Sequence, residues 1–141
     1  MATPRTWWLC RTWRFRSVLT YLLHRPSRKL FENIDGKYID VSSNAGIFQG
    51  KIGYGLGVSV GDLNNDGYPD IYVGNDFFEN DYLYLNNRDK TFKEVISENK
   101  TKLGHTSHYS MGNALADLDN NEALDIISLF IKRLVRLPYN Y

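Results

Sequence analysis

The sequence is poor in cysteine and has no long apolar run, and these two absences exclude several classes of protein. Cys10 is the only cysteine among 141 residues. An internal disulfide framework and a multi-cysteine zinc site are therefore excluded. No run of about 18 apolar residues occurs, so no transmembrane span is expected. Hydrophobic residues make up 43% and charged residues 23% of the chain, which is typical of a folded globular domain.

Acidic side chains are absent from both ends of the chain and are concentrated in its middle. Residues 1–30 carry seven Lys and Arg and no acid, and residues 131–141 carry three more basic residues and no acid. All sixteen Asp and Glu lie in residues 31–130, against seven basic side chains. This acidic middle argues against a nucleic-acid partner, because nucleic-acid binders place positive charge on the folded face.

The charge distribution divides the chain into three parts. We interpret residues 1–28 as an atypical basic leader, residues 29–130 as the folded region and residues 131–141 as an atypical basic tail. The leader is an organelle targeting segment, the product of a shifted reading frame, or a genuine structural element. For the tail, a short basic amphipathic helix competes with a strand that ends near Phe130 and an unrelated segment after it. The abrupt end of the acidic pattern favours the strand.

An internal repeat organises the middle of the chain. Shifting the sequence by 55 positions aligns residues 53–73 with residues 108–128, and seven residue types coincide. One period contains four short apolar segments, at residues 58–60, 71–73, 82–85 and 91–95. The Asn- and Asp-rich residues 86–90 give the strongest hairpin signal in the chain. Four short antiparallel strands in about 40–50 residues match one blade of a β-propeller.

The sequence therefore predicts an all-β fold, an incomplete β-propeller of about two blades, each with four antiparallel strands. The chain holds the second half of one blade, a whole blade and the first half of another. Because a propeller closes with about 4–8 blades, the sequence looks like a fragment, and further blades are expected from a longer chain.

An acidic loop over residues 62–70 carries the main chemical signal. Oxygen-bearing side chains stand at loop positions 1, 3, 5 and 9, namely Asp62, Asn64, Asp66 and Asp70. Calcium takes about six to eight oxygen ligands, and the carbonyl of Tyr68 would supply a further one. The loop has no thiolate or imidazole, so calcium is favoured over zinc.

Two other interpretations of this loop have to be weighed against a calcium site. An EF-hand begins in the same way, but it needs a bidentate Glu at position 12, where this sequence has Val73. Strand-like residues also flank the loop, so the EF-hand is excluded. A solvated acidic turn that binds nothing remains open, because Asn, Asp and Gly are common in turns.

A second acidic loop repeats the pattern over residues 117–125. Its oxygen-bearing side chains at positions 1, 3, 5 and 9 are Asp117, Asp119, Asn121 and Asp125. Glu122 stands where the first loop has Gly67. A residue other than glycine is disfavoured if this position needs a positive φ. We therefore expect Ca2+ to bind the first loop, and the second loop more weakly or not at all.

The pattern resembles the FG-GAP/VCBS repeats of integrin α-type propellers, and most closely the proteins related to cartilage acidic protein, which often carry an ASPIC/UnbV domain. The resemblance covers about residues 29–130 and is specific over 53–96. It rests on Gly55-Leu56-Gly57, on the first acidic loop, on Gly74-Asn75-Asp76-Phe77 and on the hairpin at 86–92. It implies that calcium is bound by Asp62, Asn64, Asp66, Tyr68 and Asp70. Residues 110–125 resemble the next blade, with Glu122 as a departure.

This resemblance also implies a function. We expect a non-catalytic, calcium-binding segment of a secreted or cell-surface protein for adhesion or ligand binding, with a protein or carbohydrate as ligand. The alternative is part of a propeller enzyme that acts on polysaccharides. Its candidate carboxylates would be Asp76, Glu79 and Asp81, although carboxylates in a blade connection are more often solvated.

Overall fold

The computed structural model describes residues 17–20, 28–50, 54–76, 79–98, 109–130 and 133–137. Within these residues all regular structure is β, with ten strands and no helix. The strands form three open sheets, and within each sheet the strands that follow one another in the chain pair antiparallel. Most of the predicted leader and part of the predicted tail lie outside the described residues.

The first sheet contains β1 (Ser17–Thr20), β2 (Lys29–Ile34) and β3 (Lys37–Asp40). Asp35 and Gly36 connect β2 to β3 with φ values of 50° and 86°. Two successive positive φ angles are typical of the tight hairpin turns that favour Asp-Gly. The hairpin expected for the second half of a blade is therefore present, and β1 adds a strand from the segment interpreted as a leader.

The second sheet contains β4 (Tyr54–Gly61), β5 (Asp70–Asp76), β6 (Tyr82–Asn86) and β7 (Phe92–Glu94). These strands overlap the four apolar segments of the predicted whole blade. The hairpin between β6 and β7 pairs Asn86 with Phe92, as its turn residues indicate. The sequence thus predicted the order and approximate position of all four strands.

The third sheet contains β8 (Ser110–Ala116), β9 (Asp125–Phe130) and β10 (Arg133–Leu137). Strand β9 ends at Phe130, as expected from the end of the acidic pattern. Strand β10 then pairs antiparallel with β9, so the amphipathic helix considered for this segment is wrong. The short apolar run of this segment is compatible with a strand as well as with a helix.

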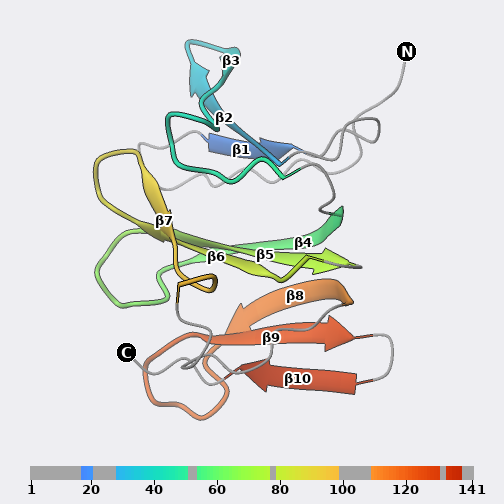
Figure 1. Ribbon diagram of the computed structural model, residues 1–141. Coiled ribbons are helices and arrows are strands. Elements are labelled where there is room, and N and C mark those ends of the chain that lie inside the picture. Colours follow the sequence, from blue (N-terminus) through green and yellow to red (C-terminus); the bar gives the residue numbers. More distant parts are fainter. Residues whose placement is uncertain are drawn as a thin grey trace.

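The three sheets lie one above another, with β4–β7 between the other two (Figure 1). Alternate residues of β5 explain this arrangement, because successive side chains of a strand point to opposite faces. Ile71 and Val73 belong to an apolar cluster shared with Leu30 of the first sheet. Tyr72 belongs to a second cluster, shared with Ile126 of the third sheet. The middle sheet is therefore buried on both faces.

Glycines in the middle sheet allow the third sheet to approach closely. A Cβ atom at Gly57 would lie 2.7 Å from Nδ2 of Asn113, and one at Gly74 would lie 2.9 Å from Cβ of Ser110. Both partners are in β8. A side chain at either glycine would therefore push the two sheets apart.

Open antiparallel sheets that stack face to face are the arrangement of an incomplete β-propeller, and the predicted fold class is confirmed. In the part of the chain that the structure describes, no helix has the length and apolar character needed to cross a membrane.

Candidate metal centre

Both acidic loops occupy the same place in their sheets. The first acidic loop, residues 62–70, connects β4 to β5, and the second acidic loop, residues 117–125, connects β8 to β9. Both loops lie on the left side of Figure 1. The 55-residue repeat of the sequence therefore places equivalent loops at the same end of neighbouring sheets.

The two loops also share their backbone conformation. Asn65 and Asn120 have φ values of 55° and 56°, and Gly67 and Glu122 have φ values of 85° and 67°. Position 6, which is Gly67 in the first loop and Glu122 in the second, thus has a positive φ in both loops. A positive φ was the condition under which the sequence disfavoured Glu122. Asparagine tolerates this region better than most residues, whereas glutamate is strained there.

Exchanging the residue types at position 6 should change stability in opposite directions. Gly67→Ala is expected to lower the free energy of unfolding by about 1 kcal/mol, because alanine resists the left-handed region. No atom lies within 4 Å of the added Cβ, so steric overlap does not contribute. Glu122→Gly should raise the free energy of unfolding by up to about 1 kcal/mol. Urea denaturation in the presence of EGTA measures both, and a destabilised Glu122→Gly would contradict the strain at this position.

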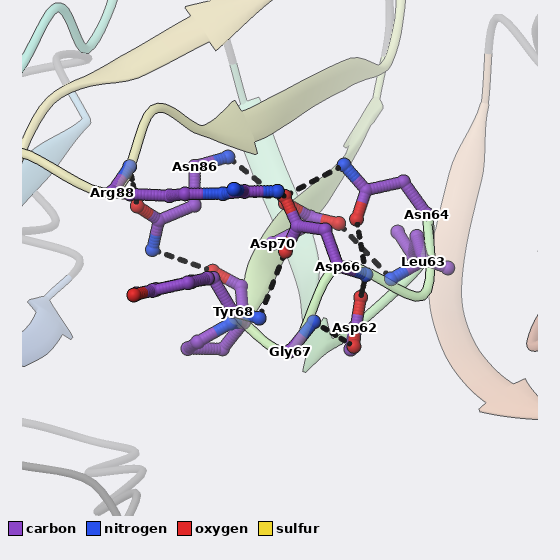
Figure 2. A network of polar contacts seen from close by, with 10 residues as sticks. Asp62, Leu63, Asn64, Asp66, Gly67, Tyr68, Asp70, Asn86 and Arg88 are labelled. Atoms are coloured by element: carbon purple, nitrogen blue, oxygen red, sulfur yellow. Dashed lines mark hydrogen bonds and ion pairs between the residues drawn. The ribbon is translucent and has the colours of Figure 1, made fainter.

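Asp62 organises the first acidic loop from its first position (Figure 2). Its Oδ1 accepts a hydrogen bond from the backbone N–H of Asp66 at 3.0 Å, and its Oδ2 accepts one from that of Gly67 at 2.7 Å. Asn64 Oδ1 also accepts from the Asp66 N–H, at 3.2 Å. Two predicted ligands therefore converge on the backbone at position 5.

Asp70 connects the loop to the neighbouring hairpin. It is fully buried, and its carboxylate accepts hydrogen bonds from the backbone N–H groups of Leu63 at 3.0 Å and Asn86 at 2.9 Å. Burial raises the pKa of Asp70 above the ordinary carboxyl value, although these two hydrogen bonds oppose the shift. The Asn86 side chain donates to the Pro69 carbonyl at 3.0 Å. Asn86 was not among the residues predicted for this loop.

Asp66 has an ion-pair partner, Arg88, that was not predicted from the sequence. Nε and Nη2 of Arg88 lie 3.4 and 3.2 Å from Asp66 Oδ2, and the guanidinium lies 5.3 Å from the centre of the Tyr68 ring. The backbone N–H of Tyr68 donates to Asp66 Oδ1 at 2.8 Å. Partial burial raises the pKa of Asp66, but the hydrogen bonds from Tyr68 and Arg88 outweigh it, and the net pKa is lowered.

The second acidic loop repeats the backbone contacts of the first. The carboxylate of Asp117 accepts from the N–H groups of Asn121 at 3.1 Å and Glu122 at 2.9 Å. Asp125 Oδ2 accepts from the Leu118 N–H at 3.0 Å. The side chains at positions 1 and 9 therefore stabilise both loops in the same way.

Three carboxylates converge in the second acidic loop. Oxygen atoms of Asp117, Asp119 and Asp125 all lie within 4.8 Å of one another, and no other such group of acids occurs among the described residues. Asp119 is exposed and Asp125 is buried, so the group of carboxylates is open to solvent on one side and lies against the protein on the other. A donor set of oxygen atoms alone fits calcium better than zinc.

The two loops also contact each other. Asn65 Nδ2 donates a hydrogen bond to the carbonyl of Glu122 at 3.4 Å. Both residues have positive φ angles, of 55° and 67°. Neighbouring sheets therefore meet at their acidic loops as well as in the apolar cluster between them.

Comparison with known families supports the repeat. The model of the FG-GAP-like repeat matches residues 62–128, which include both acidic loops and β5 to β8 in full. The predicted FG-GAP repeat is thus supported, and the narrower resemblance to proteins related to cartilage acidic protein stays a prediction. No curated protein matches the chain.

Proposed function

We propose that this chain is a non-catalytic, calcium-binding propeller segment of an extracellular or cell-surface protein that binds a protein or carbohydrate ligand. The observation that carries the proposal is the convergence of Asp117, Asp119 and Asp125 within 4.8 Å, in a loop that repeats the first acidic loop. The FG-GAP-like match over both loops supports the extracellular setting, which is common for such repeats.

Each loop contributes its own ligands to this proposal. In the first loop they are the side chains of Asp62, Asn64, Asp66 and Asp70 with the Tyr68 carbonyl, and in the second Asp117, Asp119, Asn121 and Asp125. Carboxylates held this close repel one another, and a divalent cation relieves the repulsion. By linkage, calcium at a hundred times its dissociation constant stabilises the folded chain by about 2.7 kcal/mol.

The environment of the candidate catalytic carboxylates supports a binding role over an enzymatic one. Asp81 is fully buried and accepts hydrogen bonds from Tyr72 Oη at 2.6 Å and Ser110 Oγ at 2.8 Å. Glu79 forms an ion pair with the buried Arg28. Both carboxylates thus have structural partners on neighbouring sheets, whereas a general acid or base has to reach a substrate.

Asp119→Asn should weaken calcium binding by the full chain at least about tenfold, because it removes one of three anionic ligands. Asp119 is exposed, so the isosteric change leaves the fold intact. Calorimetric titration of calcium after EGTA treatment measures the effect.

The matched control is Asp35→Asn. Asp35 is an exposed acid in the turn between β2 and β3, and asparagine tolerates its φ of 50°. This variant should bind calcium like the wild type. Equal affinities of Asp119→Asn and the wild type would refute the site in the second loop.

A further inference from the structure

We propose that Arg88 is a built-in cation of the first acidic loop and that it lowers the affinity of this loop for calcium. The inference rests on the proposed calcium binding and concerns which loop binds the ion first. The guanidinium group of Arg88 lies beside the first acidic loop, in contact with Asp66 (Figure 2).

The position of Arg88 is set by the hairpin between β6 and β7. Its backbone has a φ of 68°, and its N–H donates to Asn86 Oδ1 at 2.8 Å. The backbone N–H of Asn86 in turn donates to Asp70 of the loop at 2.9 Å. The hairpin is thus attached to the loop, and the Arg88 side chain reaches Asp66, with Nη2 3.2 Å from Oδ2.

Asp66 is the ligand on which the guanidinium acts. Its Oδ2 receives Arg88 Nη2 at 3.2 Å and Asn64 Nδ2 at 3.2 Å, while its Oδ1 receives the Tyr68 N–H at 2.8 Å. A calcium ion that takes Asp66 Oδ2 has to displace the guanidinium, and the two cations then repel each other. Both effects weaken binding, because Arg88 keeps its charge at every ordinary pH.

The second loop differs at this same position. It has the neutral Asn121 at position 5, so no carboxylate there offers an ion pair. Its three carboxylates lie within 4.8 Å of one another, an arrangement that is not found in the first loop. We therefore infer that the second loop binds the first calcium equivalent. This order is opposite to the one expected from Gly67 and Glu122 alone.

The test is calcium titration of the full chain carrying Asp119→Asn, which weakens the second loop so that the first loop contributes a larger share of the binding. In this background Arg88→Met should tighten calcium binding about three- to tenfold, an effect limited by the 57% exposure of the Arg88 side chain. Methionine retains an apolar stem against Tyr68 and removes the charge. Arg88→Lys, which retains the charge, should stay near the parent affinity.

The matched control is Lys90→Met. Lys90 belongs to the same turn and has a φ of 73°, but its ammonium pairs with Glu32 at 2.9 Å. The Lys90→Met variant should therefore change the calcium affinity less than twofold. A circular dichroism melt in EGTA verifies that each variant folds, and Arg88→Gln replaces Arg88→Met if the latter does not.

The outcomes separate this inference from the proposed function. If calcium binds neither the wild type nor Arg88→Met, the calcium proposal itself is overturned. If the wild type binds calcium but Arg88→Met does not tighten the first loop, Arg88 has no such role. If Lys90→Met and Arg88→Met tighten calcium binding equally, the effect comes from the overall charge of the chain and not from the position of Arg88. This result would also overturn the inference.

Discussion

Asp81→Ala should lower the free energy of unfolding by about 3–5 kcal/mol, because it leaves three hydrogen-bond donors without their buried acceptor. The Asp81 carboxylate receives Tyr72 Oη at 2.6 Å, the Asn75 backbone N–H at 2.7 Å and Ser110 Oγ at 2.8 Å. Ser110 Oγ also lies 2.7 Å from Ser128 Oγ. The network joins the second sheet to the third, so both sheets lose support when Asp81 is removed.

Tyr72→Phe is the graded control for this prediction. It removes one donor and leaves the carboxylate with its other partners, so a loss of about 1 kcal/mol is expected. Urea denaturation with unchanged m-values measures both variants. A loss below about 1 kcal/mol for Asp81→Ala would mean that the network does not hold the sheets together.

Glu79→Ala should lower the free energy of unfolding by about 3 kcal/mol, because it leaves the Arg28 cation buried without its counter-ion. The Arg28 side chain is 2% exposed and that of Glu79 is 17% exposed. The guanidinium also donates to Asn75 Oδ1 at 3.1 Å and lies 4.2 Å from the centre of the Tyr82 ring. These contacts fix the cation in place, so it cannot move to solvent when Glu79 is lost.

The exposed pair of Lys93 and Glu98 provides the comparison. Its side chains are 57% and 59% exposed, and Nζ lies 2.9 Å from Oε2. Glu98→Ala should change the free energy of unfolding by less than about 0.5 kcal/mol. Thermal melts of the two variants side by side measure the contrast. Similar losses would show that burial does not control the strength of the Arg28–Glu79 pair.

The strands could be predicted from the sequence because their signals are local. Ile71 to Val73 and Tyr82 to Leu85 are short apolar runs between polar turns, and both became strands buried on two faces. The acidic loops could be located because the repeat placed the same oxygen-bearing residues at the same positions twice. The strain at Glu122 followed from its alignment with Gly67.

The contacts between sheets could not be predicted, because no local pattern encodes them. Asp81 was a candidate catalytic carboxylate since a buried acceptor and a solvent-facing acid look alike in a sequence. No side-chain contact was predicted for Arg28 or Arg88, yet they contact residues 51 and 22 positions away. Strand β10 was missed because short apolar runs fit helices and strands alike.

The sequential pairing of the strands also has a kinetic consequence. Within each sheet, strands that follow one another in the chain are paired, so each sheet can form from local hairpins, which form within about 1–10 μs. Contacts such as Ser110 with Asp81 join separate sheets across 29 residues, and they can form only after the sheets exist. The losses in Asp81→Ala and Glu79→Ala should therefore accelerate unfolding while refolding rates stay nearly constant. The time for which neighbouring sheets remain together is then set by a few buried polar contacts between them.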